Sequence, residues 1–266
     1  MKSFFKKLLN PFLGNVRYQK LFEYLHQLSL YGMHIGRGGS KDDSGEGVAI
    51  KYIQQKLKDE KQVTVFDVGA NIGSYSILLN SILKDEPRIY SFEPSKKTYQ
   101  TLVENTKHFS NVSTYNFGFG NEDASLTLFS NKDESGLASV YHRKLDHLHI
   151  DMNKTEEIEI KTIDGFCEQN NINHIHFLKI DVEGHEMKVL EGARNIINSK
   201  NIDFIQFEFG GCNIDSRTYF QDFFYLLKDD YTIYRIVRNG IYPIKTYKEI
   251  YEAFMTTNYL AERLNR

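Results

Sequence analysis

The sequence predicts an α/β protein with a mostly parallel sheet and helices on both faces. From residue 63 onward, short apolar runs that suit buried strands alternate with segments of helical periodicity. A glycine-containing turn follows the first of these runs directly, and several of the runs end in an acidic residue. In an alternating α/β chain such strand ends meet at one edge of the sheet, where ligands bind.

The first strand is predicted at Val63–Val68, and a helix is expected from about Ile72 to Leu83. The glycines between them permit a tight turn and a close approach of the backbone to a ligand. The helix would point its free N–H groups at whatever lies above that turn. This pattern is typical of a nucleotide-cofactor pocket. The predicted cofactor contacts in the turn are Gly69, Ala70, Asn71 and Gly73.

The turn differs from those that bind dinucleotides. A pyrophosphate-binding turn needs G-x-G-x-x-G, whereas no glycine lies between Gly69 and Gly73. The carboxylate of Asp67, just before the turn, would repel a phosphate but suits a ligand with a cationic amine or sulfonium. S-adenosylmethionine has these groups, so it is the expected cofactor. A nicotinamide enzyme is the poorer alternative.

A second strand is predicted within Arg88–Pro94, and it ends in the acidic residue Glu93. The ends of two strands in a right-handed β-α-β unit lie side by side. Glu93 is therefore expected to accept hydrogen bonds from both ribose hydroxyls of the cofactor, which a carboxylate can do bidentately. The alternative is an ordinary crossover with a surface glutamate.

The composition limits the function classes. A chain of 266 residues with 41% hydrophobic residues can bury one large α/β core with an appendage. The net charge of −2 gives no electrostatic footprint for nucleic acid. Cys167 and Cys212 have no metal-motif spacing and are too few for a disulfide framework. No stretch has the length of a membrane span or the pattern of a signal peptide, so a cytoplasmic protein is expected.

Residues 1–60 are predicted to form an N-terminal helical extension and cap, ahead of a cofactor-binding domain at residues 61–266. Basic and apolar residues alternate at its start, which suits a helix on a membrane surface. A helical arm that packs on its own domain or on a second subunit, as in a homodimer, would show the same pattern. Tyr31–Gly47 is glycine-rich and is expected to form a loop over the pocket, with a helix at Val48–Leu57. The residues of the basic and apolar pattern are Lys2, Phe4, Phe5, Lys6, Lys7, Leu8, Leu9, Phe12, Leu13, Arg17 and Lys20.

After Glu93, a helix is expected at Ser95–Phe109 and a third strand at Val112–Phe117. The turn Gly118-Phe119-Gly120 that follows is predicted to lie beside the adenine of the cofactor. Strands at Leu126–Phe129 and Ile158–Ile163 flank a polar segment, 130–157, that is too long for a simple connection and is expected to shape the acceptor site. The segment contains three histidines whose spacing would suit a metal, but a solvated loop is the favoured interpretation. These histidines are His142, His147 and His149.

A second region dense in titratable groups covers residues 176–186, where a strand opens into a loop that contains Asp181, Glu183 and His185. One helix later, a further buried strand ends in Glu208. If these strands are parallel neighbours, Asp181 and Glu208 share the sheet edge with Asp67 and Glu93. Each of these four carboxylates must be exposed to solvent, paired with a cation or used in the function of the protein.

Three blocks together resemble the FkbM-type methyltransferases: residues 66–73, residues 92–94, and residues 178–186 with 189–193. The resemblance extends from about Val48 to Phe209. It implies a class I, Rossmann-like, S-adenosylmethionine-dependent methyltransferase fold with a mostly parallel seven-stranded sheet and a late antiparallel hairpin. Tyr231–Val237 and Ile241–Tyr247, joined through Asn239-Gly240, independently predict that hairpin. The resemblance also implies O-methylation of sugars, polysaccharides or polyketide hydroxyls.

Methyl transfer to a hydroxyl needs an in-line arrangement and removal of a proton. His185 is the candidate base, because imidazole titrates near neutral pH; the alternative is a histidine that only caps the following helix. Asp181 and Glu208, aided by Glu183, would otherwise hold a Mg²⁺ ion that acidifies the acceptor. In the absence of a metal, Asp181 would orient the acceptor, and Glu183 with Glu186 would anchor the loop.

The expected function is O-methylation of a hydroxyl on a saccharide, such as a surface glycan or its precursor. An O-methyltransferase acting on a lipid-linked or small-molecule hydroxyl is the first alternative, and it would be favoured if the basic N-terminal segment contacts the inner face of a membrane. A non-catalytic cofactor-binding scaffold is the second.

Overall fold

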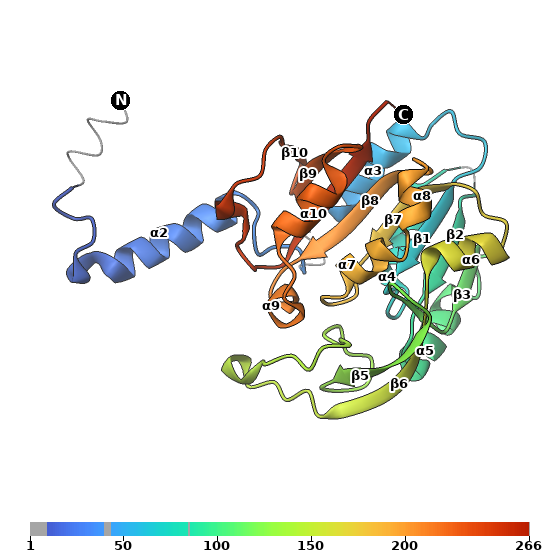
Figure 1. Cartoon of the computed structure of the whole chain (residues 1–266), viewed down its shortest axis with the longest axis horizontal. Helices are drawn as coiled ribbons and strands as arrows, with labels where there is room; N and C mark the ends of the chain where they lie inside the picture. Colours follow the sequence, from blue (N-terminus) through green and yellow to red (C-terminus); the bar gives the residue numbers. More distant parts are fainter. Residues whose placement is uncertain (1–9, 40–43, 85, 266) are drawn as a thin grey trace.

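The computed structural model describes residues 10–39, 44–84 and 86–265. Within this part of the chain, a main sheet of eight strands is accompanied by a smaller sheet of three (Figure 1). The main sheet, in spatial order, consists of β10 (Gly240–Ile244), β9 (Tyr231–Val237), β11 (Thr257–Arg263), β8 (Ile202–Phe209), β7 (Ile175–Ile180), β1 (Thr64–Val68), β2 (Arg88–Phe92) and β3 (Val112–Tyr115).

The sheet is mostly parallel, as predicted. Strands β3, β2, β1, β7 and β8 are parallel neighbours, whereas β11 pairs antiparallel with both β8 and β9. The order reverses at β1, since β2 lies on one side of it and β7 on the other. Such a reversal opens a crevice at the carboxyl ends of the two strands.

The predicted late hairpin is confirmed, because β9 and β10 pair antiparallel through the Arg238–Asn239 turn. The strand count differs from the predicted seven, since β10 adds an edge strand to β9. Strand β11, which separates β9 from β8, was not predicted at all.

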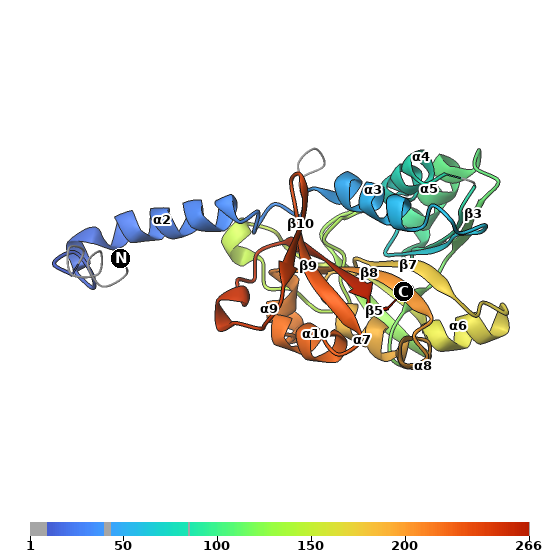
Figure 2. The same cartoon turned by 90° about the horizontal axis from the view of Figure 1, so that it is seen from above.

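Helices cover both faces of the main sheet (Figure 2). One face has α3 (Glu46–Lys56), α4 (Ser74–Ile82) and α5 (Lys96–Thr106). The other has α6 (Ile163–Gln169), α7 (Glu186–Glu191), α8 (Arg194–Asn198) and α10 (Phe220–Leu227), and α9 (Cys212–Ser216) follows the end of β8. Every residue of β7 and β8 is buried, as expected for central strands covered on both faces.

The core has one apolar cluster on each face of the sheet. An aromatic group built around Phe66, Phe92 and Phe166 lies on the α6 face. On the opposite face, Ile50 and Ile53 of α3 pack with the side chains of α4 and β1. Although α3 lies in the predicted N-terminal extension, it is part of this core.

The smaller sheet consists of β4 (Gly118–Phe119), β6 (Lys154–Lys161) and β5 (Ala124–Ser130). The predicted strands at 126–129 and 158–163 correspond to β5 and β6, which pair antiparallel over their whole length. The connection between them includes the short 3-10 helix η2 (Asp146–Leu148) and folds back so that Ser139 bridges to Phe129. This folding brings the polar segment toward the carboxyl edge of the main sheet.

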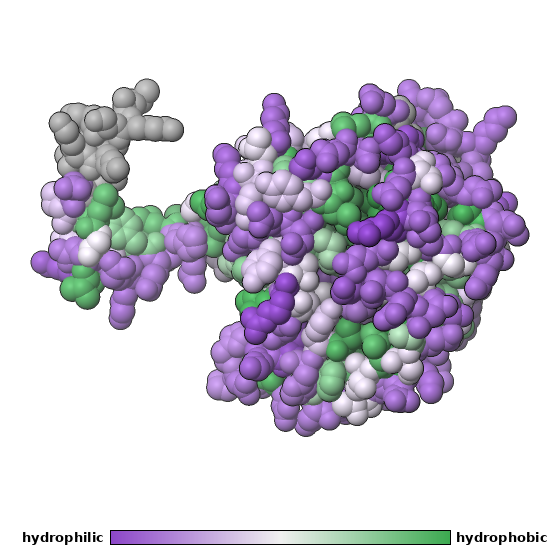
Figure 3. All heavy atoms as spheres, viewed as in Figure 1, coloured by the Kyte–Doolittle hydropathy of each residue, from purple (hydrophilic) through white to green (hydrophobic). Residues whose placement is uncertain are grey.

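Helix α2 (Gln19–Gly32), preceded by the 3-10 helix η1 (Val16–Tyr18), extends away from the rest of the molecule (Figures 1 and 2). Within α2, all of whose residues are described, Leu30 is the buried side chain. The packing of the N-terminal basic and apolar segment on its own domain or on a second subunit stays a prediction. Figure 3 shows apolar side chains along the arm. The lysines at positions 2, 6 and 7, on which the membrane-surface interpretation depends, lie outside the described residues.

In the described residues, none of the helices combines the length and the apolar character that crossing a membrane requires.

Candidate functional site

A cavity of about 510 Å³ lies at the carboxyl ends of β1, β2, β7 and β8. Eight of the predicted site residues line it, and three do not. The lining residues are Gly69, Asn71, Glu93, Gly118, Asp181, Glu183, His185 and Glu208. Further lining residues come from the 135–143 segment and from residues 38–39 and 256–258. The polar segment between β5 and β6 therefore forms part of the cavity wall.

The turn after β1 is closed by its own hydrogen bonds. The N–H groups of Gly69 and Ala70 both donate to the carbonyl oxygen of Phe92, and the N–H of Asn71 donates to the Glu93 carboxylate. The next two amides, at Ile72 and Gly73, also donate to acceptors within the turn. These five amides are therefore occupied by β2, by Glu93 and by the turn itself, so the amides of Ile72 and Gly73 are not free for a ligand, contrary to the expectation.

Only glycine fits at position 69. Its φ is +80°, and a Cβ atom there would lie 1.9 Å from the carbonyl oxygen of Asp181. Gly73 has φ +88°, but the nearest neighbour of an added Cβ is Leu102 of α5, at 2.8 Å. Gly73 thus serves the packing of α4 on α5. Neither Gly73 nor Ala70 lines the cavity, so their predicted cofactor contacts are not found.

Asp67 is fully buried and does not line the cavity, contrary to the predicted direct contact with the cofactor. One of its carboxylate oxygens accepts a 2.6 Å hydrogen bond from Ser76, and the other lies 3.7 Å from the amino group of Lys179. Burial raises the pKa of Asp67, and the Lys179 charge opposes that shift. The side chains of α4 and β7 enclose this carboxylate, which acts as an internal anchor behind the cavity.

Glu93 occupies the predicted position at the end of β2. One oxygen accepts from the N–H of Asn71 at 3.0 Å, and the other accepts from the N–H of Ser95 at 2.9 Å. Burial raises the pKa of Glu93 to about 7, against the effect of these two bonds. A carboxylate oxygen can accept more than one hydrogen bond, so both oxygens retain capacity for a ligand hydroxyl.

The loop after β7 is held from inside by Glu186. This buried side chain accepts hydrogen bonds from the N–H groups of Val182 and Gly184, at 3.1 and 3.0 Å. Burial raises its pKa to about 7. Glu186 thus has the predicted anchoring role, whereas Glu183 does not share it and instead pairs with a side chain that was not predicted, Arg143.

Arg143 comes from the segment between β5 and β6 and is the one cationic side chain among the described residues that line the cavity. Its guanidinium pairs with Glu183, and it lies 3.9 Å from the carboxylate of Asp215. Burial raises the pKa of Glu183 to about 8, with Asp181 adding to the shift and Arg143 opposing it. Sequence reasoning missed Arg143 because a single arginine in a polar loop has no distinguishing pattern.

Two more lining residues were missed, Glu46 and Asn258. Glu46 lies at the first position of α3, where it accepts a 3.0 Å hydrogen bond from Gln206 of β8. Asn258 is on β11, directly opposite Glu208 in the antiparallel register. Glu46 lies in the segment 31–47 that was expected to form a loop over the pocket, although it begins α3, whereas Asn258 lies on β11, which was not predicted.

His185 lines the cavity as predicted, at the start of α7. Its Nδ1 atom lies 3.1 Å from the hydroxyl oxygen of Tyr141. Burial lowers the pKa of His185 to about 4, and the charge of Lys188 adds to the shift. The imidazole is therefore neutral near pH 7, with a ring orientation fixed by the tyrosine.

The predicted Mg²⁺ ligands are not brought together as a set. Among the described residues, Glu183 and Glu208 approach each other within 4.8 Å in a group whose third member is Cys212, not Asp181. Burial raises the pKa of Glu208 well above its usual range and also raises that of the Cys212 thiol. A thiol does not suit Mg²⁺, which prefers charged oxygen ligands, and Asp181 is not a member of the group. The structure gives the magnesium hypothesis no support.

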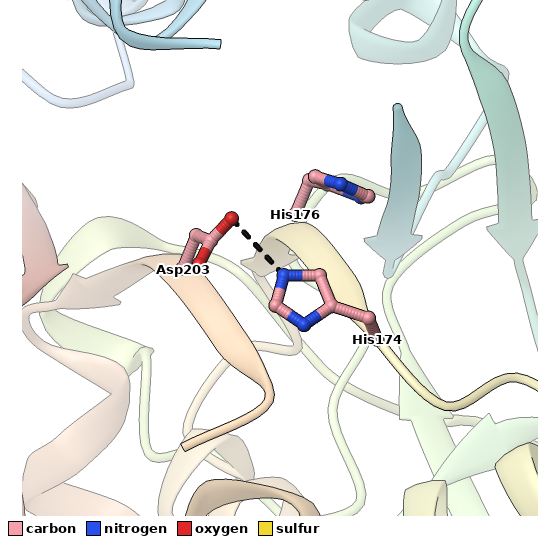
Figure 4. Close-up of side chains that lie close together, drawn as sticks. All are labelled: His174, His176 and Asp203. Atoms are coloured by element: carbon pink, nitrogen blue, oxygen red, sulfur yellow. Dashed lines mark ion pairs between the residues drawn. The ribbon is translucent and has the colours of Figure 1, made fainter. Parts of the chain in front are cut away.

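A second group of potential metal ligands lies at the opposite edge of the sheet, where β7 and β8 begin (Figure 4). His174 faces Asp203 at 3.0 Å, and Arg263 also donates to Asp203 at 2.8 and 3.2 Å. His176 accepts from the N–H of Thr64 at 3.0 Å. The arginine already neutralises the aspartate, so these contacts are sufficiently explained as links between strand ends.

Comparison of the sequence with models of known protein families identifies a match. The family model described as the methyltransferase FkbM domain matches residues 67–231. This match begins at the end of β1 and covers the strands and loops that follow it as far as the start of β9. No curated protein sequence is significantly similar to the chain.

Solved methyltransferase structures resemble it only distantly. An O-methyltransferase from Bacillus cereus in complex with SAH is 13% identical, with 97% of this chain and 96% of that chain covered and a TM-score of 0.43. A putative O-methyltransferase from Klebsiella pneumoniae is 9% identical, with 97% and 94% covered and a TM-score of 0.45. A precorrin-6y C5,15-methyltransferase from Geobacter metallireducens is 12% identical, with 81% and 88% covered and a TM-score of 0.40.

The family match covers more than half of the chain and coincides with the strand order and the cavity described above. The predicted class I methyltransferase fold is thereby confirmed, with one edge strand more than expected. The chain belongs to the FkbM methyltransferase family.

Proposed function

We propose that the protein transfers a methyl group from S-adenosylmethionine to a hydroxyl group of a saccharide, such as a surface glycan or its precursor. The observation that carries this proposal is the charge of the cavity. Five carboxyl side chains line it against the single guanidinium of Arg143 among the described residues. The carboxyl groups belong to Glu46, Glu93, Asp181, Glu183 and Glu208.

An acidic, partly buried cavity favours a ligand with a net positive charge. S-adenosylmethionine has a sulfonium and an ammonium group against one carboxylate, whereas a dinucleotide would bring two negative phosphates into the same space. Glu93 is placed to accept from the ribose hydroxyls, and Asp181, whose side chain is 34% exposed, is available to the ammonium group. Lys179, 3.2 Å from Asp181, holds that carboxylate in place.

The proposed acceptor is a saccharide because the cavity lining combines hydrogen-bonding and apolar surfaces. Carboxylate oxygens and the Asn258 amide can bond several hydroxyls at once. Leu137, Ala138 and Val140, from the segment between β5 and β6, line the same cavity and can cover the apolar face of a sugar ring.

In the proposed mechanism, neutral His185 would accept the proton of the acceptor hydroxyl, and S-adenosylmethionine, when bound, would supply the methyl group. Tyr141 bonds to Nδ1, which leaves Nε2 for the acceptor. A base with a low pKa supplies less driving force, but it is unprotonated throughout the neutral range. The cavity would contribute further by holding the acceptor in line with the methyl donor.

A lipid-linked hydroxyl is the second candidate acceptor, and one observation favours it. Helix α2 exposes a row of apolar side chains, among them Leu25 at 44% and Leu28 at 53% exposure. A lipid surface at the inner face of the membrane is one environment that would cover such a row.

The test is incubation of the purified protein with S-adenosylmethionine that has an isotopically labelled methyl group and a panel of cell-envelope glycans and nucleotide sugars. Mass spectrometry then identifies what gains the label. A labelled ether on a sugar hydroxyl supports the proposal. Label on a lipid-linked acceptor alone supports the second candidate, and label on nitrogen or carbon contradicts O-methylation.

A further inference from the structure

A second cavity, of about 720 Å³, lies outside the methyl-transfer site. It is enclosed by the last turn of α2, the residues that follow it, the hairpin of β9 and β10, and the 3-10 helix η3 (Glu249–Tyr251). Its lining is basic and aromatic, in contrast to the acidic first cavity. The residues that give it this character are Tyr31, Arg37, Arg235, Arg238, Tyr242 and Tyr251.

Arg235 is the unusual residue in this cavity. Its side chain comes from β9, and the residue is only 5% exposed. The guanidinium lies 5.4 Å from the ring centre of Tyr242, its cross-strand partner in β10. Its buried Nε atom has no hydrogen-bond partner, and no carboxylate in the described part of the chain forms an ion pair with it. A buried cation without an anion is costly unless something else supplies the negative charge.

The surroundings of Arg235 favour an anion. Among the described residues that line the cavity, none is acidic. Arg37 and Arg238 also line the cavity, and each is engaged by another group. A guanidinium matches the oxygens of a phosphoryl group bidentately, and the tyrosine hydroxyls can donate further hydrogen bonds.

The second cavity borders the first. Arg37 lines the second cavity and the next two residues, Gly38 and Gly39, line the first. The N–H of Gly38 donates to the carbonyl oxygen of Thr256, which also lines the first cavity, at 2.9 Å. The two cavities therefore share the Arg37–Gly39 segment as a wall, and a ligand that occupies both would need two or more linked rings to extend along it.

We propose that the second cavity binds the phosphoryl group of the methyl acceptor through Arg235, so that the acceptor is a saccharide linked to a phosphate or diphosphate. This inference rests on the proposed function of the first cavity. Nucleotide sugars and lipid-linked saccharides share the same diphosphate chemistry, and the arginine fork recognises that shared group. The acidic first cavity excludes the phosphoryl group and directs it to the basic one.

The test is a calorimetric titration of the full chain with inorganic diphosphate at constant ionic strength. The wild-type protein is expected to bind it, and Arg235→Met to bind it at least tenfold more weakly. Arg235→Lys keeps the charge and loses the planar fork, so we expect an intermediate loss. Arg194→Gln, which changes an exposed arginine on α8, is the matched control and should bind like wild type. Each variant is first shown to unfold cooperatively.

The absence of diphosphate binding by wild type, or equal binding by wild type and both Arg235 variants, would overturn the proposal. Uridine diphosphate and geranyl diphosphate distinguish the two sources. If uridine diphosphate binds more tightly than inorganic diphosphate, the acceptor is nucleotide-linked. If geranyl diphosphate binds more tightly than inorganic diphosphate, the acceptor is lipid-linked. S-adenosylmethionine is titrated into the same samples. If S-adenosylmethionine binds and diphosphate does not, only this inference is overturned. If diphosphate binds and S-adenosylmethionine does not, the proposed methyl donor is overturned.

Discussion

The residues in and behind the cavity are held in place by different contacts. A residue could be predicted from the sequence only where its position does not depend on contacts between distant elements. Glu93 was predictable because an acid at the end of a buried strand, one crossover after a glycine turn, has few other places to lie. Asp67 is also an acid near the end of a buried strand, but its contacts with Ser76 and Lys179 keep its carboxylate out of the cavity. Those contacts depend on the packing of α4 and β7, which no pattern along β1 reveals.

His185 is the residue whose proposed role is most directly tested by substitution. His185→Ala should lower turnover by roughly 10²- to 10⁴-fold while leaving cofactor affinity unchanged, because the imidazole contributes as a base and not to binding. The measurement is steady-state kinetics together with a cofactor titration. His147→Ala, an exposed histidine on η2, is the control and should keep wild-type turnover. Unchanged turnover in His185→Ala would remove this side chain from the mechanism.

At the level of elements, the alternation of apolar runs and helical segments predicted the strands of the main sheet from β1 to β9 with small shifts in their ends. In the smaller sheet, β4 lies in residues predicted as a turn, and the first half of β6 lies in the predicted polar segment 130–157. Strand β11 escaped prediction, although five of its residues are buried, because its last two residues, Glu262 and Arg263, are charged and no turn signal precedes it. Its place between β8 and β9 is a consequence of tertiary pairing. Asn258 lies on this strand, so it was missed as a cavity residue together with the strand.

Helix α2, which lies in the predicted helical extension, gives a stability test. Leu25→Glu with Leu28→Glu should change the free energy of unfolding by no more than about 0.5 kcal/mol, since both side chains are exposed and removed from the core. Thermal unfolding monitored by circular dichroism is the measurement. Leu30→Glu, on the same helix but only 5% exposed, is the control and should lower the unfolding temperature clearly. A similar fall in the double variant would mean that a partner covers this face in the free protein.

Across the whole molecule, the charges are distributed far less evenly than the net charge of −2 suggests. Acids gather around the methyl-transfer cavity, whereas arginines gather around the neighbouring cavity. The sequence indicated the first concentration because its acids follow strands. It did not indicate the second, since α2, β9 and η3 are far apart along the chain and only the fold brings their basic and aromatic residues together.

The buried acids predict an unusual pH dependence of stability. Burial raises the pKa of Glu93 and Glu186 to about 7 and that of Glu183 to about 8. The folded protein therefore binds more protons than the unfolded chain between pH of about 4.5 and 8, so their contribution to stability is lost as the pH rises through this range. His185, whose folded pKa is lowered to about 4, has the opposite effect only below its usual pKa of about 6.5.

From pH 6.5 to 8, the unfolding temperature of the ligand-free protein should consequently fall. Differential scanning calorimetry at constant ionic strength measures this change. Addition of the cationic cofactor should reduce the fall, because it supplies positive charge to the ionised acids. A rising unfolding temperature over the same interval would show that the cavity acids are already ionised in the folded protein.

The central claim is that the acidic cavity at the ends of β1 and β2 binds S-adenosylmethionine through Glu93. Calorimetric titration tests it most directly. Wild type should bind one S-adenosylmethionine per chain and no NAD. Glu93→Ala should bind more weakly by about 1.5 to 3 kcal/mol, or roughly 10- to 150-fold, while Glu104→Ala on the exposed side of α5 should match wild type. Wild-type affinity in Glu93→Ala, or binding of NAD in place of S-adenosylmethionine, would contradict the account.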